Sequence, residues 1–87
     1  MPFTFHTDPG HGWLEVSIRD VQALGLHSLD FTHYSYVSHD GTKLYLEEDC
    51  DASHFLQAYK AKYGQEAIVH ERNVNRDSFI RSLPNNY

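Results

Sequence analysis

Apolar and polar residues alternate in short runs that predict five β-strands. These runs lie at 3–5, 12–16, 33–38, 43–48 and 67–71. A Pro9-Gly10 turn joins the first two, and an Asp40-Gly41 pair between the third and fourth is the strongest hairpin signal in the chain. The alternation within the fourth run places Leu44 and Leu46 toward the core and Tyr45 on the opposite face of the sheet.

Two segments between these runs carry the signals of helices. The first, at about 18–24, has Ser17 as its N-cap, an acidic residue three positions later, and Gly25 as its stop. The second begins at Asp51, shows apolar residues at a 3.6-residue period, and ends at Gly64. The order ββαββαβ predicts an α+β fold, in which a mostly antiparallel sheet carries both helices on one face.

The length and composition predict one small domain. We expect it to occupy residues 1–72, followed by a polar tail, residues 73–87, that packs on the domain or extends from it. The single cysteine excludes an internal disulfide, and no apolar run approaches the roughly 18 residues of a membrane span. The first residues lack the basic and apolar regions of a signal peptide, so we expect a cytoplasmic location and no membrane partner.

Negative charge is concentrated in the first part of the chain. The net charge is −5, and residues 1–51 hold nine acids against two basic residues. A protein that binds nucleic acid generally would show a basic stripe instead. We therefore expect no general nucleic-acid binding.

Four of these acids fall within residues 47–51, a segment that we call the acidic knot. It comprises Glu47, Glu48, Asp49 and Asp51. Three interpretations stay open: caps for the second helix, an acidic patch for a partner, or a site for a hard cation. We favour capping by Asp49 and Asp51, with Glu47 and Glu48 left in solvent.

Two other places combine residues with chemical potential. Cys50 lies inside the acidic knot, where neighbouring carboxylates disfavour a reactive thiolate, so we expect a half-buried thiol rather than a Cys50–His54 catalytic pair. His6 and His11 flank Asp8 with a spacing that could close on Zn²⁺, although the Asp-Pro-Gly turn favours a structural role.

The tail carries arginines that suit either of two roles. Arg72 or Arg76 could turn back to the acidic knot and anchor the tail by an ion pair. Alternatively, the tail could bind a ligand or partner, because arginine forks suit phosphate and carboxylate groups.

Three stretches resemble parts of small uncharacterised proteins found in bacteria and on phages and plasmids. These are residues 8–16 (DPGHGWLEV), residues 44–52 (LYLEEDCDA) and residues 75–81 (NRDSFIR). The resemblance covers most of the chain and implies no assigned activity. It implies an accessory protein of a mobile element, including an inhibitor of host machinery.

Together these features predict a non-enzymatic protein that binds a protein partner. The resemblance implies a phage- or plasmid-encoded inhibitor of a host or defence protein, which would act in the host cytoplasm. The predicted contact residues are acidic, aromatic or basic: Glu47, Glu48, Asp49, Asp51, Tyr34, Tyr36, Tyr45, Arg76 and Arg81. We assign no catalytic residue, metal or cofactor, and a homo-oligomer stays open. The alternative is a small metal- or nucleotide-dependent enzyme that combines the acidic knot with His and Arg residues.

Overall fold

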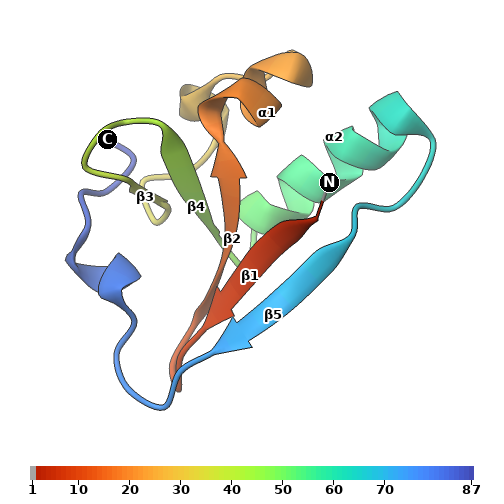
Figure 1. Cartoon of the computed structure of the whole chain (residues 1–87). Helices are drawn as coiled ribbons and strands as arrows, with labels where there is room; N and C mark the ends of the chain where they lie inside the picture. The colour runs from red at the N-terminus through yellow and green to blue at the C-terminus, as the bar shows by residue number, and fades with distance from the viewer. Residues whose placement is uncertain (1) are drawn as a thin grey trace.

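The computed structural model describes residues 2–87, which form a sheet with helices on one face and the tail on the other (Figure 1). In chain order the elements are β1 (Phe3–Thr7), β2 (Gly12–Ser17), α1 (Ile18–Ala23), a 3₁₀ turn (Ser28–Asp30), β3 (Tyr36–Val37), β4 (Lys43–Glu47), α2 (Asp51–Tyr63), β5 (Val69–Asn73) and a second 3₁₀ turn (Phe79–Ser82). The predicted α+β class is confirmed.

The five strands lie side by side in the order β3-β4-β2-β1-β5. Only β5 runs parallel to its neighbour, β1, and the other pairs are antiparallel. The predicted Asp40-Gly41 hairpin is present, but β3 covers only two residues of the predicted run. The residues before it form a turn instead, because Thr32 and Ser35 donate hydrogen bonds to Asp51.

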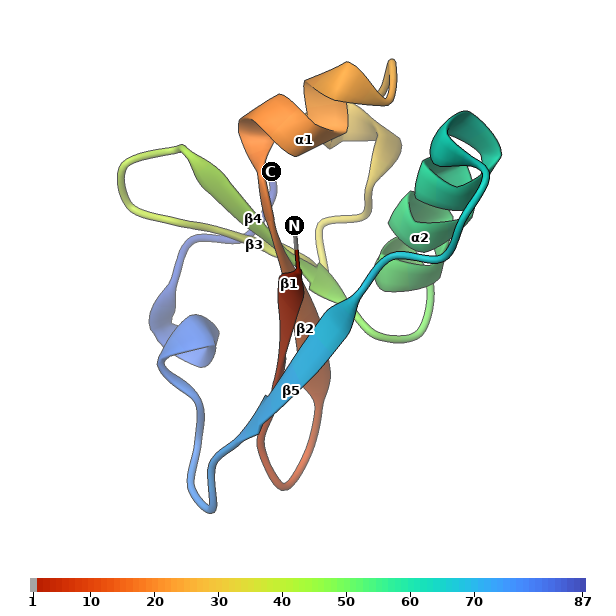
Figure 2. The same cartoon turned by 45° about the vertical axis from the view of Figure 1, so that its right-hand side comes forward.

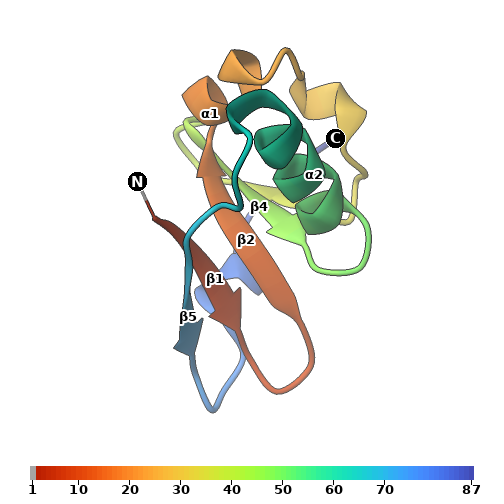
Figure 3. The ribbon, with the colours of Figure 1, turned by 90° about the vertical axis from the view of Figure 1, so that its right-hand side faces the viewer.

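The face of the sheet that carries the helices holds the larger core. The alternation in β2 and β4 directs their leucines and Val16 toward α1 and α2, which lie together on this side (Figure 3). The buried members of this core are Phe3, Leu14, Val16, Val21, Phe31, Leu44, Leu46, Ala52 and Phe55. The rings of Phe3 and Phe55 meet edge to face at a centroid distance of 5.4 Å, so strand and helix interlock through their largest side chains.

The opposite face is covered by the tail, which lies across the sheet from α2 (Figure 2). Here Ile80 packs against Trp13 and Tyr45 in a second buried cluster. Tyr45 therefore lies on the predicted face of the sheet but is only 6% exposed. Its assignment to an exposed contact surface was wrong, because the tail removes it from solvent.

Both ends of α1 follow the predicted local rules. Ser17 Oγ accepts a hydrogen bond from the Asp20 amide at 3.0 Å, and Asp20 Oδ2 accepts one from the Ser17 amide at 3.2 Å. At the other end Gly25 adopts a φ of 73°, and the Leu26 amide donates to the Val21 carbonyl at 3.1 Å. These bonds satisfy backbone groups that a six-residue helix would otherwise leave unpaired.

The second helix, α2, begins at Asp51 and ends where predicted, at Gly64. Gly64 has a φ of 74°, and its amide donates to the Lys60 carbonyl at 2.8 Å. Among the helices of residues 2–87, none has both the length and the apolar composition needed to cross a bilayer.

Replacing Ser17 with Ala should destabilise the protein by about 1 kcal/mol, because the Asp20 amide loses its acceptor. The free energy of unfolding measured by urea denaturation tests this. Ser53→Ala is the control, since Ser53 is exposed in α2 and its hydroxyl accepts one exposed side-chain bond, from Gln57, and no backbone amide. Equal stabilities for Ser17→Ala and the wild type would contradict the cap.

Candidate functional site

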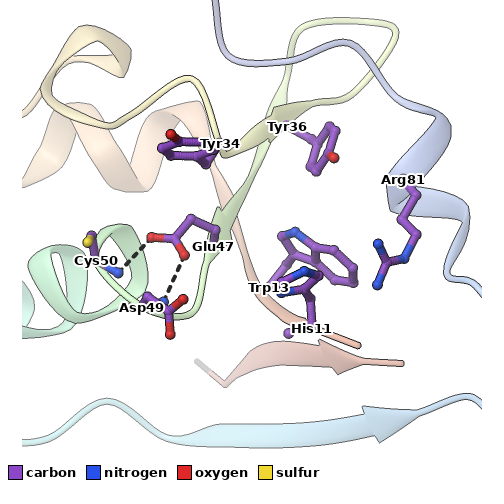
Figure 4. Close-up of a pocket in the computed structure, with 9 residues that line it drawn as sticks. His11, Trp13, Tyr34, Tyr36, Glu47, Asp49, Cys50 and Arg81 are labelled. Carbon is purple, nitrogen blue, oxygen red and sulfur yellow. Dashed lines mark hydrogen bonds between the residues drawn. The ribbon is translucent and has the colours of Figure 1, made fainter. Parts of the chain in front are cut away.

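A cavity of about 340 Å³ opens where the start of β2, the end of β4 and the tail meet (Figure 4). We call it the Trp13 pocket. Its lining residues are His11, Gly12, Trp13, Tyr34, Tyr36, Glu47, Asp49, Cys50 and Arg81. The pocket therefore brings together the His-containing turn, the tyrosines, the acidic knot and the tail, which are far apart in the sequence.

Trp13 forms the inner wall of the pocket and is only 3% exposed. The Tyr36 ring meets it at a centroid distance of 6.2 Å and an angle of 70°, and the His11 ring lies 6.1 Å away. Arg81 places its guanidinium carbon 5.3 Å from the centre of the indole. Tyr34 stands at the rim, 65% exposed. The wall is thus fixed by packing, while the rim is open to solvent.

The Arg81 side chain is oriented by the buried carboxylate of Asp8. Arg81 Nε and Nη2 donate to the two oxygens of Asp8 at 2.6 and 2.8 Å. The same carboxylate accepts amide hydrogen bonds from Gly10, His11 and Ser78 at 2.9 to 3.0 Å. The bonds from Arg81, and then those from the amides, hold the pKa of Asp8 well below its usual range despite burial.

This ion pair corrects one expectation about the tail. Neither Arg72 nor Arg76 turns back to the acidic knot; the tail is anchored instead by Arg81 on Asp8. The reason is geometric: the 3₁₀ turn at Phe79–Ser82 packs Ile80 on the sheet and so brings Arg81 beside the β1–β2 turn.

Within the acidic knot, Glu47 caps α2. Its carboxylate accepts the amides of Asp49 at 2.8 Å, Cys50 at 2.6 Å and Asp51 at 3.1 Å, and Figure 4 shows the first two bonds. The N-cap position belongs to Cys50, whose side chain makes no capping bond. The prediction that Asp49 and Asp51 cap the helix while Glu47 is free was therefore wrong.

Asp51 is buried, with 3% of its surface exposed. Its Oδ2 accepts hydrogen bonds from the Thr32 amide at 2.9 Å, the Thr32 hydroxyl at 2.7 Å and the Ser35 hydroxyl at 2.5 Å. Ser35 Oγ in turn accepts the Glu47 amide at 3.0 Å, which links both acids in one network. Asp51 thus joins α2 to the segment before β3 and is not part of a surface that a partner could touch.

The remaining residues of the knot face solvent. Glu48, Asp49 and Cys50 are exposed. The expectation of a half-buried Cys50 was therefore wrong. Because Glu47 caps the helix, the side chain at the N-cap position stays in solvent. Among residues 2–87 no hydrogen bond connects Cys50 to an imidazole, and His54 packs instead on Phe31 at a centroid distance of 5.3 Å.

The two histidines of the β1–β2 region have separate environments. His6 is buried, and its Nε2 lies 2.8 Å from Glu15 Oε1. His11 is exposed, with Nδ1 3.9 Å from Glu48 Oε1. In the part of the chain that the structure covers, no three His, Cys, Asp or Glu side chains are placed to hold a metal ion together.

Of the predicted contact residues, the Trp13 pocket includes Tyr34, Tyr36, Glu47, Asp49 and Arg81. Glu48 lies near its edge beside His11, whereas Arg76 lines a different cavity. Trp13 was not among the predicted residues. The available signal was the alternation of β2, which places Trp13 and its neighbour Leu14 on opposite faces of the sheet.

Comparison of the chain with family models, curated proteins and solved structures found no match. The geometry of the site therefore carries the functional argument.

Replacing Asp8 with Asn should destabilise the protein by about 2 kcal/mol at neutral pH, because Arg81 loses a charged, buried partner. The folded-state pKa of Asp8 is lowered, so its contribution is fully present above the unfolded value of about 4 and is lost as pH falls below it. Urea denaturation of both proteins from pH 7 to pH 3 should show their stability difference shrinking toward acid.

The control for this experiment is Asp77→Asn, because the Asp77 carboxylate is exposed and lies 4.0 Å from Arg81. It should change stability by less than about 0.5 kcal/mol. A stability difference between wild type and Asp8→Asn that stays constant or widens toward low pH would contradict the assignment.

The stabilities of Glu47→Lys and Glu48→Lys should distinguish the loss of a helix cap from the loss of a surface charge. Glu47→Lys should cost about 2 kcal/mol, because three amides lose their acceptor and a cation is placed at the positive end of α2. Glu48 accepts none of these bonds, so its reversal should be nearly neutral. Thermal melts of the two variants provide the test, and equal destabilisation would refute the capping role.

Proposed function

We propose that this protein is a non-enzymatic binding protein that accepts a basic side chain of a protein partner at the Trp13 pocket. The observation that carries the proposal is the composition of the pocket. Aromatic rings and acidic groups line it together, while its one arginine is already paired with Asp8.

The charges around the pocket favour a cation. Asp8 neutralises Arg81, whereas Asp49 is exposed and Glu48 lies close by. Glu47 also lines the pocket, where its carboxylate accepts the amides at the start of α2. A concave site with this balance attracts positive groups and speeds their encounter.

The aromatic groups add attraction of a second kind. The faces of tyrosine and tryptophan rings attract ammonium and guanidinium groups at distances of about 6 Å. Tyr36 leans on Trp13 in the wall, and Tyr34 stands at the rim. Lysine or arginine is the side chain that matches both the rings and the carboxylates.

The surroundings of the pocket favour a protein partner over a free small molecule. The Tyr34 ring lies 4.3 Å from that of His33, and the exposed Tyr87 lies 6.2 Å from His33. Exposed tyrosines beside a polar cavity are typical of interfaces, because tyrosine buries a large area at low entropic cost. We extend the proposal to a host or defence protein as the partner and its inhibition as the outcome, which is the expectation implied by the resemblance of residues 8–16, 44–52 and 75–81.

The test uses two acetylated, amidated pentapeptides of glycine, one with a central arginine and one with the neutral isostere citrulline. The chain has one Trp and one Cys, and both line the pocket. Titration should change Trp13 fluorescence and slow the alkylation of Cys50 only with the arginine peptide. Equal effects of both peptides, or none, would overturn the proposal.

Charge reversal then identifies the acid responsible. Asp49→Lys should weaken binding of the arginine peptide about tenfold, equivalent to roughly 1.4 kcal/mol. Glu71→Lys is the matched control, because Glu71 is exposed on β5 and does not line the pocket. If both reversals weaken binding equally, the net charge of the protein and not the pocket is responsible.

A further inference from the structure

A second cavity, of about 370 Å³, lies where β1 and β5 end beside the tail. We call it the Arg72–Arg76 cavity. It is lined by His6, Thr7, Arg72, Val74, Arg76, Asp77, Ser78 and Phe79. Nothing in the proposed function uses it.

Most of the Lys and Arg side chains of residues 2–87 that form no ion pair or hydrogen bond line this cavity. Lys43, Lys60 and Arg81 form ion pairs, and Lys62 donates to the Ala23 carbonyl. Within residues 2–87, three basic side chains form neither an ion pair nor a side-chain hydrogen bond: Arg19, Arg72 and Arg76. Two of these three line this one cavity, although the chain has 12 acids and a net charge of −5.

Both arginines are presented by backbone that is held in place. Arg72 lies on β5 in register with His6 of β1. Arg76 lies on a short loop that is fixed at both ends: the Val74 amide donates to the Thr7 carbonyl at 3.0 Å, and the Ser78 amide donates to Asp8 at 2.9 Å. Binding of a ligand between the two guanidinium groups would therefore order only the arginine side chains and not the backbone, which lowers the entropic cost of binding.

The lining defines the chemistry of the ligand. Guanidinium groups bind oxyanions through paired hydrogen bonds, and two of them suit the double charge of a phosphate monoester. The Phe79 ring packs edge-on against His6 and Tyr45 at 5.7 Å and remains 56% exposed. Its free surface could hold an aromatic group attached to that phosphate.

We propose that the Arg72–Arg76 cavity binds a phosphate monoester with an aromatic carrier, the phosphate lying between the two arginines and the carrier against Phe79. Asp77, the one carboxylate that lines the cavity, is almost fully exposed and leaves the balance of charge positive. This site is distinct from the Trp13 pocket and does not depend on the function proposed for it.

The test is an NMR titration of the full chain with inorganic phosphate, phenyl phosphate and adenosine monophosphate. Amide shifts should move at Arg72, Arg76 and Ser78, and the esters should bind at least fivefold more tightly than phosphate. The ester that binds more tightly distinguishes a simple aryl phosphate from a nucleotide. Absence of shifts at these amides up to about 10 mM of each probe would overturn the proposal, and equal affinities for all three would contradict the role of Phe79.

Three glutamine variants supply the control. Arg72→Gln and Arg76→Gln should each weaken binding of the better ester about tenfold, as the loss of one guanidinium contact predicts. Arg19→Gln removes the same charge from α1, outside the cavity, and should change affinity less than twofold. Equal losses in all three variants would mean that only net charge matters. Because the three side chains are exposed and unpaired, thermal melts should show each variant folded.

Discussion

The hydrogen bonds to the Asp8 carboxylate hold the tail on the face of the sheet opposite the helices, and the rest of that face depends on them. The carboxylate accepts five hydrogen bonds from groups in two segments, the β1–β2 turn and the tail. A buried charge is costly unless its lone pairs are engaged, and here both oxygens are. By holding Ser78 and Arg81, the same carboxylate fixes the 3₁₀ turn that covers Tyr45 and contributes residues to both cavities.

Much of the fold was predictable because its signals are local. The Ser17 cap, the Gly25 and Gly64 stops and the Asp40-Gly41 hairpin each depend on residues a few positions apart. The roles within the acidic knot were not predictable in the same way. Asp51 pairs with Thr32 and Ser35, 19 and 16 residues away, and this distant contact removes it from the capping role that Glu47 fills.

The sequence predicted several residues of the candidate site, but not that they meet in one pocket. Alternation put Tyr45 on the correct face of β4, but exposure depends on what covers that face, and Ile80 of the tail does so. For the same reason the tail separated two predicted contact residues, because Arg81 reaches the Trp13 pocket while Arg76 lines the other cavity. The tail docks through contacts between residues that are far apart in the sequence, and hydrophobic periodicity reports only on neighbouring residues.

The docking of the tail also decides the charge of each cavity. Arg81 lies over Trp13, and without Asp8 its charge would oppose the binding of any cation there. The ion pair removes that opposition and leaves the acids of the knot to set the potential of the Trp13 pocket. Since Asp8 is engaged by Arg81, it is not available to Arg72 or Arg76, whose charges remain free in the second cavity. The same ion pair, with its buried carboxylate, therefore leaves one cavity acidic and the other basic. Because tail residues line both cavities, an event that releases the tail would alter both together.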